Sequence, residues 1–446
     1  MRADICVSHI PMLIHNEALS VVWQPSALLS GPKSQVTPER TMIKKLLMIL
    51  FLILVCAGSK ALENESREKG QVLLSRVSKL YQLTGKWRFS SRDDLSYADP
   101  DYDDSTWRWA SVPGVWTQMG IGFTEHAWYR YRFRFSEAFT VFPMGIKVPP
   151  IYDAHQVYIN GILIGGAGKI TPDGRIDKKS SRPGIYQIPS SILREDNWNV
   201  IALRIADDVG WGGITKSDFM IGRLAILELR FSKFIVWNSA LVLILGFLGA
   251  FFLTAYAGNR REKSLLHFSL LSIVLSFMLS GYHSLSYLLI DSFWFFHFAV
   301  NTGVHLAIVF LLRFIYCFFR LPPDRFLRFF TISSVALFGG LLISPAHLSL
   351  MRFYAHWIYS TSLGIDALAL LFIVMLMIKF VKEKRPQARI VGAGCLISFL
   401  CALNDMIGYI FALDNYQLLM EGIVIFMISM SFAMFIRYTR FDSPTG

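Results

Sequence analysis

The sequence predicts a membrane all-α bundle of seven helices, preceded by an all-β sandwich of the jelly-roll type. Two patterns support this: apolar runs of membrane-spanning length fill the second half, and short alternating runs fill most of the first. The composition agrees, because 53% hydrophobic and 17% charged residues are too apolar for an ordinary soluble protein of 446 residues. The length leaves room for one domain outside the bilayer.

The predicted helical domain, residues 232–437, contains seven apolar runs separated by short polar breaks. Most of them exceed the roughly 18 residues that a helix needs to cross a hydrocarbon core about 30 Å thick. The fourth run is the weakest, being short and interrupted by Gly339 and Gly340. The runs are 234–256, 265–288, 293–314, 329–343, 357–378, 390–411 and 418–436.

The loops between the runs predict the orientation. Loops after the first, third, fifth and seventh runs are rich in Lys and Arg, whereas the opposite loops carry only Arg352. Cationic loops are retained in the cytoplasm, so we expect a multi-pass protein of the cell inner membrane, with its first domain periplasmic and a cytoplasmic stub at 438–446. This topology also explains much of the net charge of +12, so we expect no nucleic-acid partner.

The N-terminal residues read as an export signal. Residues 42–61 open with Lys44 and Lys45, followed by an apolar stretch at 46–55 and then by small residues, which is the order of a secretory signal peptide. Residues 1–41 show no sustained period, and we interpret them as a mis-annotated extension. The alternative is a true extension ahead of a signal anchor.

Residues 62–231 are predicted to form the sandwich. Between 83 and 231 the chain reads as strands and turns, and residues 128–135 alternate aromatic residues with Arg, which predicts one buried and one solvated face. Asn160 and Gly161 between two apolar runs indicate a hairpin. None of the five cysteines lies in this domain, so its core must hold it without disulfides.

Several motifs of the sandwich carry a family resemblance. They are Gly85-Lys86-Trp87-Arg88-Phe89, Tyr102-Asp103-Asp104-Ser105-Thr106-Trp107, Val112-Pro113-Gly114-Val115-Trp116, Val157-Tyr158-Ile159-Asn160-Gly161 and Asn197-Trp198-Asn199-Val200. In order and spacing they resemble the sugar-binding jelly-roll domain of family-two glycoside hydrolases. The same module occurs outside the cytoplasm in bacterial seven-transmembrane receptors with diverse intracellular signalling modules.

The membrane block is similar to that receptor family too. Residues 245–252 of the first run lead into a basic loop, and Leu403-Asn404-Asp405-Met406 resembles the family's Asn-Asp motif. Members usually continue into a kinase, cyclase or phosphatase module, whereas this sequence has ten residues after Ile436. The resemblance therefore implies a receptor whose output is a cytoplasmic partner in trans, or has been lost.

Candidate ligand-binding residues follow from sugar chemistry. Aromatic faces hold the apolar side of a sugar ring, and Asn, Asp and Arg bind its hydroxyls. We select Trp109, Trp128, Asn160 and Trp211, the last in the Gly-rich loop 209–213, against the alternative that such aromatics form the sandwich core. The acidic pairs 93–94 and 103–104 are assigned to turns, so we predict no catalytic residues and no enzyme.

Polar residues inside the runs are the second candidate site, because ionisable groups in a bilayer are costly. We expect them to line a polar cavity that opens outward and couples ligand state to helix arrangement; the alternative is interhelical hydrogen bonding. No metal or cofactor is predicted, since two histidines without a third ligand fall short of a coordination set. These residues are His297, Asn301, His305, Asp366, Asn404, Asp405 and Glu421.

Together these observations predict a receptor-like multi-pass membrane protein that senses a small, carbohydrate-like ligand and signals through a partner in trans. Besides that ligand and partner, we expect contact with membrane lipid, and the basic loop 379–389 fits either an acidic protein or anionic lipid. Two other functions remain open. They are a transporter or embedded enzyme that uses the intramembrane His and Asp, and a polysaccharide-binding accessory subunit.

Overall fold

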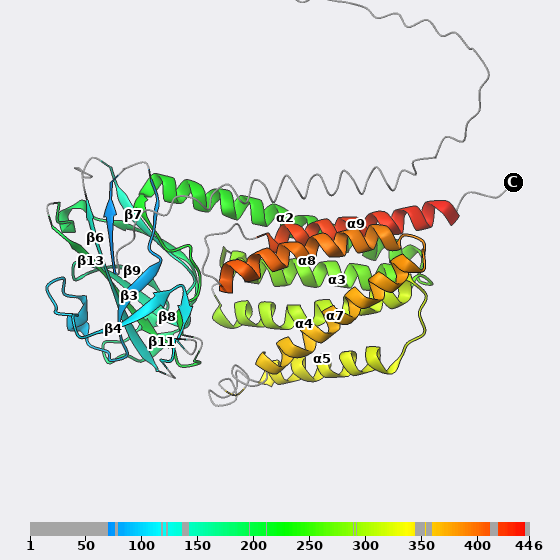
Figure 1. Cartoon of the computed structure of the whole chain (residues 1–446), viewed down its shortest axis with the longest axis horizontal. Coiled ribbons are helices and arrows are strands. Elements are labelled where there is room, and N and C mark those ends of the chain that lie inside the picture. The colour runs from blue at the N-terminus through cyan, green and yellow to red at the C-terminus, as the bar shows by residue number, and fades with distance from the viewer. Residues whose placement is uncertain are drawn as a thin grey trace, which may run out of the picture.

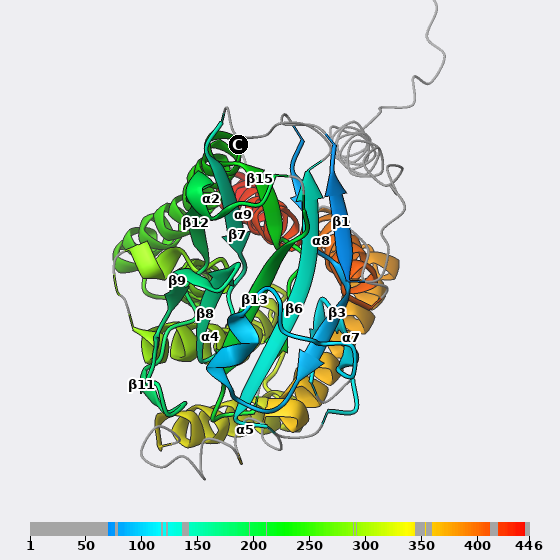
Figure 2. The same cartoon turned by 90° about the vertical axis from the view of Figure 1, so that its left-hand side faces the viewer.

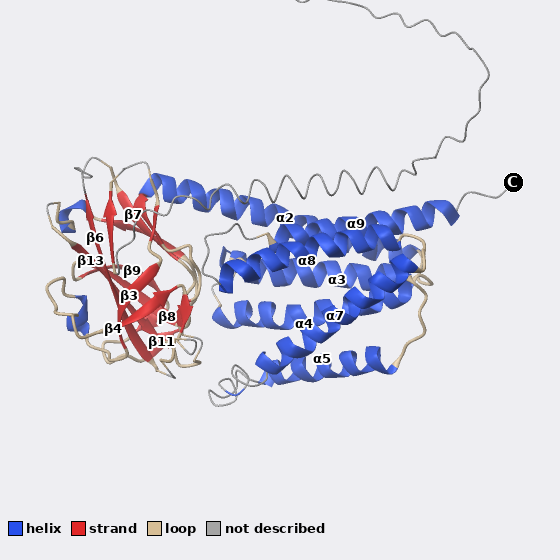
Figure 3. Ribbon diagram, viewed as in Figure 1, coloured by secondary structure: helices blue, strands red, loops and turns tan. Residues whose placement is uncertain are grey.

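The computed structural model describes residues 70–441, except 76–78, 117–118, 122–123, 136–141, 196, 211, 289, 291, 344–352, 354–358 and 411–417. The predicted extension 1–41, the signal peptide 42–61 and most of the stub 438–446 lie outside these residues. Strands gather at one end of the molecule and long helices fill the other (Figures 1 and 3). The predicted fold class, a β-sandwich followed by a membrane helical bundle, is confirmed.

The larger sheet has seven strands in the order β4-β3-β6-β13-β8-β9, with β1 pairing in parallel with β6. Strand β13 runs antiparallel to β6 on one side and to β8 on the other, which places it at the centre (Figure 2). The strands are β1 Gln71–Leu74, β3 Gly85–Ser90, β4 Arg108–Val112, β6 His126–Phe135, β8 Ala154–Ile159, β9 Ile162–Ala167 and β13 Asn199–Ala206.

The smaller sheet has four strands in the order β12-β7-β15-β2. Two further pairs, β14 with β5 and β10 with β11, and two short 3-10 helices complete the sandwich. These elements are β2 Tyr81–Gln82, β5 Gly114–Val115, β7 Met144–Val148, β10 Lys169–Ile170, β11 Ile176–Lys178, β12 Gly184–Ile188, β14 Gly213–Ile214, β15 Met220–Arg223, η1 Leu95–Ala98 and η2 Ser190–Ile192.

Aromatic side chains from both sheets fill the space between them. Trp87 lies 5.1 Å from Phe219, centroid to centroid, and Trp116 donates a hydrogen bond of 2.8 Å to the Tyr129 hydroxyl. Each such side chain contributes about 1.5–3 kcal/mol when fully buried. This core accounts for a sandwich without disulfides, and alternate residues of β6, including Tyr129 and Tyr131, point into it as the alternation predicts.

The helical part contains seven long helices among the described residues. Of these, five are long and apolar enough to cross a membrane by length and composition, and a shorter apolar segment spans 303–318. The short 3-10 helix η3, Leu285–Leu288, lies between the second and third helices. The helices are α2 Leu224–Gly258, α3 Lys263–Tyr282, α4 Phe293–Phe318, α5 Arg325–Ile343, α7 Tyr359–Lys382, α8 Ala388–Ile410 and α9 Leu419–Phe441.

Helix α2 joins the two parts of the molecule. It has 35 residues, which at about 1.5 Å per residue is about 52 Å, well beyond a core of about 30 Å. Its first turns therefore stand outside the membrane, and it begins at Leu224, immediately after β15 ends at Arg223 and earlier than the predicted domain start at 232. Leu227 is buried near Gly145 of β7, so the helix start is packed into the sandwich.

Neighbouring helices form tight pairs. Three serines of α3 donate hydrogen bonds of 2.7–2.9 Å to carbonyls of α2, from Ser269 to Gly249, from Ser272 to Leu245 and from Ser276 to Val242. Helices α8 and α9 approach through Gly394 and Gly422, where an added Cβ would meet Ser429 and Cys401. Small residues allow such close backbone approach in membranes.

Candidate functional site

The candidate ligand residues occupy different environments. Trp109 on β4 is 36% exposed, and the Arg88 guanidinium carbon lies 4.0 Å from its ring centroid. Trp128 has no exposed surface; its Nε1 donates to Asp93 at 2.8 Å and its ring contacts Tyr158. A fully buried indole cannot meet a ligand, so of these two tryptophans Trp109 alone offers an accessible face.

Asn160 holds together two connections of the sandwich. It lies in the hairpin between β8 and β9 with φ of 47°. Its Nδ2 donates to Asn199 at 2.8 Å and to the Ile192 carbonyl at 2.7 Å, and its Oδ1 accepts from the Val200 amide. Its amide group is therefore engaged within the fold. Trp211, the fourth candidate, lies outside the described residues.

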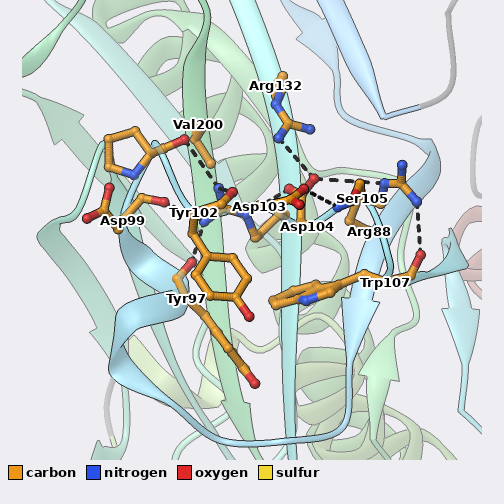
Figure 4. Close-up of polar contacts among 12 residues, drawn as sticks. Arg88, Tyr97, Asp99, Tyr102, Asp103, Asp104, Ser105, Trp107, Arg132 and Val200 are labelled. Carbon is orange, nitrogen blue, oxygen red and sulfur yellow. Dashed lines mark hydrogen bonds and ion pairs between the residues drawn. The ribbon is translucent and has the colours of Figure 1, made fainter.

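The segment between β3 and β4 covers the outer face of the larger sheet. Asp104, 2% exposed, accepts hydrogen bonds from Arg130 Nε at 2.8 Å and from Arg132 Nη2 at 2.9 Å (Figure 4). Arg130 also donates to the carbonyls of Tyr97 and Asp99. The prediction of a solvated face on β6 holds at Arg134, which is exposed, but is wrong at Trp128 and Arg130, because buried ion pairs hold this segment against that part of the strand. The motif at 102–107 therefore stabilises the fold through Asp104.

One residue of each acidic pair, Asp94 or Asp103, acts locally. Asp94 Oδ1 accepts from the Ser96 amide at 2.8 Å and caps η1, while Asp103 Oδ1 accepts from the Ser105 amide at 2.9 Å. Asp93 is bound by Arg204, whose Nε donates at 2.8 Å. Their assignment to turns is confirmed for Asp94 and Asp103.

A buried acidic cluster that the sequence did not reveal lies where β8 begins and β13 ends. Asp153 and Asp207 have no exposed surface, and Lys179 Nζ lies 3.0 Å from Asp153 Oδ2 and also contacts Asp208. Burial raises the pKa of Asp207 to about 6 and raises that of Asp153 well above its usual value. His155, two residues from Asp153, has its pKa lowered by burial to about 4.

The cluster is connected to the helices through two serines. The Ser180 amide donates to the Asp153 carbonyl at 2.7 Å. Ser181 Oγ lies 2.8 Å from the hydroxyl of Tyr287 in η3, and its amide donates to the same hydroxyl at 3.2 Å. The sandwich therefore touches the helices at η3 as well as through α2. No sequence signal marks this contact, since Ser181 and Tyr287 are 106 positions apart.

The described intramembrane residues link different helix pairs. His305 Nδ1 on α4 lies 2.7 Å from Asp366 Oδ2 on α7, both buried. Glu421 on α9 accepts from Trp237 Nε1 on α2 at 2.9 Å. His297 and Asn301 lie on α4, and their side chains are outside the described part.

Asp405 on α8 caps the N-terminus of α9. Its carboxylate oxygens accept from the amides of Leu418 at 2.7 Å and Leu419 at 2.9 Å, and Asn404 donates to it at 3.0 Å. A carboxylate at a helix N-terminus satisfies amides that lack intrahelical partners. Glu421 and Asp405 thus make hydrogen bonds between helices, whereas His305 and Asp366 lie within ion-pair distance without hydrogen-bond geometry.

At the end of the bundle far from the sandwich, α9 is bound to two other elements. Arg437 donates to the Phe318 carbonyl at the end of α4 and lies 4.0 Å from Glu262 in the α2–α3 loop. The Tyr438 hydroxyl also contacts Glu262, at 3.2 Å. Arg385 donates to the Phe319 carbonyl at 3.2 Å. These bonds cross between the α2–α4 group and the α7–α9 group.

Comparison with solved structures found likenesses limited to part of the chain. The Bacteroides uniformis β-glucuronidase is 17% identical, with 32% of this chain and 17% of that chain covered and a TM-score of 0.27. A Bacteroides vulgatus β-glycosidase is 20% identical, with 32% of this chain and 20% of that chain covered and a TM-score of 0.25. The Ruminococcus gnavus β-glucuronidase is 13% identical, with 32% of this chain and 29% of that chain covered and a TM-score of 0.26. The chain thus spans less than a third of these enzymes. No curated protein matches it.

The helical part gave a family match. Residues 235–437 match the model described as 7TM diverse intracellular signalling, a family of membrane sensory receptors. The matched segment begins within α2 and ends within α9, so it takes in all seven described helices. This chain is therefore a membrane protein whose helical part matches the model of the 7TM diverse intracellular signalling family.

Proposed function

We propose that this protein is a receptor-like sensor: the sandwich binds a small carbohydrate-like ligand outside the cytoplasm, and the helices pass the ligand state to a cytoplasmic signalling protein. One observation carries the proposal. Strand β15 continues without a loop into α2, which is packed against β7 and runs on through the membrane. A displacement of the smaller sheet is therefore transmitted directly to the first span.

The exposed surface of Trp109 supports a sugar as ligand. With Arg88 over its ring and Gly70 beside its six-membered ring, the indole keeps 36% of its surface exposed next to a guanidinium, the combination that takes a sugar ring and its hydroxyls. Because the described aromatics of the core and of the covered face are buried or half-buried, we place ligand contact on Trp109.

Transmission within the bundle uses the boundary between its two helix groups. The serine bonds make α2 and α3 one unit, and the close glycines make α8 and α9 another. Between the groups lie the pairs Trp237–Glu421 and His305–Asp366 and the bonds of Arg437. A ligand shifts such a bundle only by binding one arrangement more tightly than another.

The proposed orientation places the sandwich in the periplasm and the far end of the helices in the cytoplasm of a bacterial inner membrane. Exposed cations gather in the far loops, at Arg260, Arg261, Arg320 and Lys384. Cytoplasmic loops carry such an excess, and an acidic face on a signalling partner would complement it. We propose no enzymatic activity, since the acidic pairs of the sandwich serve turns and ion pairs.

The test uses the full chain in lipid nanodiscs on a glycan array. Wild type is expected to bind a subset of glycans, and Trp109→Ala to lose up to about tenfold in affinity, since stacking contributes about 0.5–1.5 kcal/mol. Leu95→Ala, another exposed apolar side chain of the sandwich, serves as the control. Equal binding by wild type and Trp109→Ala would remove Trp109 from the site. Absence of glycan binding by wild type would reject a carbohydrate ligand.

One observation favours a second candidate, a proton-coupled transporter. A buried histidine next to a carboxylate within the membrane is an arrangement that proton relays use. Uptake of solute into vesicles, abolished by His305→Gln, would support transport. Reporter fusions at Ser217 and Pro444 test the orientation that the receptor requires, and signals from the same compartment would contradict it.

A further inference from the structure

A small charged cluster lies where the sandwich meets the ends of α2 and α3. Lys147 of β7 is buried, and its Nζ lies 2.9 Å from Asp218 Oδ2. Lys216 lies two residues before Asp218, and its Nζ is 5.2 Å from the ring centroid of Tyr282, the last residue of α3. The cluster therefore holds two ammonium groups and one carboxylate, a net charge of +1 counted on these three side chains.

Counted over the described residues, the charge balance of this cluster is incomplete. Asp218 forms an ion pair with Lys147. Within the described residues, Lys216 has no carboxylate within ion-pair distance. Burial lowers the pKa of Lys216, although Asp218 opposes this. Asp218 Oδ1 is itself buried and accepts no hydrogen bond within the described part of the chain. An anion that also donates a hydrogen bond would satisfy both groups.

The position of the cluster indicates which anion is available. Aromatic rings surround it: Phe231 and Phe234 of α2 lie 5.6 and 5.8 Å from Lys147 Nζ. The Phe234 ring in turn lies 5.6 Å from that of His283, which follows α3. The ends of two membrane helices thus meet here, at the depth where aromatic residues border the lipid headgroups. The phosphates of phospholipids occupy that layer.

We propose that this junction binds an anionic phospholipid headgroup, with Lys216 holding the phosphate and Asp218 Oδ1 accepting a headgroup hydroxyl. Phosphatidylglycerol has both features: a phosphodiester of charge −1 and a glycerol with free hydroxyls. Phosphatidylcholine has no net charge and no donor. The bound lipid neutralises the cluster and ties the sandwich to the outer ends of α2 and α3. The site acts independently of the ligand proposed for the sandwich.

The experiment titrates the full chain in detergent with phosphatidylglycerol or phosphatidylcholine and counts bound lipids by native mass spectrometry. We expect wild type to prefer phosphatidylglycerol. Lys216→Gln should weaken that binding about fivefold, since one lysine near a lipid surface contributes about 1 kcal/mol. Lys216→Arg should retain it. The matched control is Lys86→Gln, because Lys86 is an exposed lysine of β3 bonded to Ser111.

Three results would overturn the site. The first is a wild type that does not distinguish the two lipids, and this comparison needs no variant to fold. The second is a Lys216→Gln protein that binds phosphatidylglycerol as wild type does. A loss shared equally by Lys216→Gln and Lys86→Gln would also reject it, since it would show a general effect of charge.

Discussion

His155 gives a stability prediction with a definite sign. Its side chain is 1% exposed in β8, and neither ring nitrogen has a hydrogen-bond partner within the described structure. Burial lowers its pKa to about 4, against about 6.5 in an unfolded chain. Between these pH values the unfolded chain binds the proton and the folded chain does not. The folded protein is therefore most stable, as far as His155 is concerned, above pH 6.5, and it loses this stability as the pH falls toward 4. A shift of about 2.5 units corresponds to about 3 kcal/mol.

The perturbation is His155→Leu, which removes the titrating group at nearly constant volume. The quantity to measure is the difference in stability between variant and wild type at pH 7 and again near pH 4, because packing effects cancel between the two. We expect the variant to gain about 3 kcal/mol on acidification relative to wild type, or about 10 °C in unfolding midpoint. Fluorescence of the buried Trp87, Trp116 and Trp128 reports unfolding of the sandwich in the full chain.

Ile205 provides the control, since it is buried and faces His155 across the β8–β13 ladder. Ile205→Val should cost about 1 kcal/mol at both pH values, because it changes packing alone. If His155→Leu also shifts the midpoint equally at both pH values, the imidazole is not held neutral by burial and the reasoning fails.

Three further predictions concern carboxylates. Asp207→Asn should remove a pH dependence of stability whose sign is opposite to that of His155. The raised pKa of Asp207 means that wild type loses stability as the pH rises from about 4 to about 6, and unfolding midpoints of the variant measured across this range should lack this loss. Asp104→Ala should lower the free energy of unfolding by about 3–5 kcal/mol, because it leaves Arg130 buried without its partner. The neighbouring Asp103→Ala should lower it by about 1 kcal/mol in the same denaturant titration. Equal losses of stability in the two variants would contradict the ion-pair account. Asp405→Ala should raise the rate of amide hydrogen exchange in the first turn of α9. Asp405→Asn keeps one acceptor oxygen and should raise it less. Unchanged exchange in both variants would show that the cap is dispensable.

The candidate site was predictable only where its signal is local. An Asx turn is made by residues two apart, so the roles of Asp94 and Asp103 follow from the sequence. Tryptophans are different: Trp109 and Trp128 both occupy strands, and only the position of the 93–107 segment over the sheet leaves one accessible and buries the other. The intramembrane residues were found by their cost in lipid, but the sequence did not show which of them pair, as His305 does with Asp366.

By itself, the sequence determined the class of protein: apolar runs long enough to span a bilayer, and alternation that buries one face of each strand, both properties of residues close together in the chain. The tertiary structure alone decided which polar groups meet. Asp104 with Arg130, Ser181 with Tyr287 and His305 with Asp366 lie 26 or more positions apart. Such pairs exist because burial makes an unpaired charge or hydroxyl costly, and only the packed chain shows which partner is within reach.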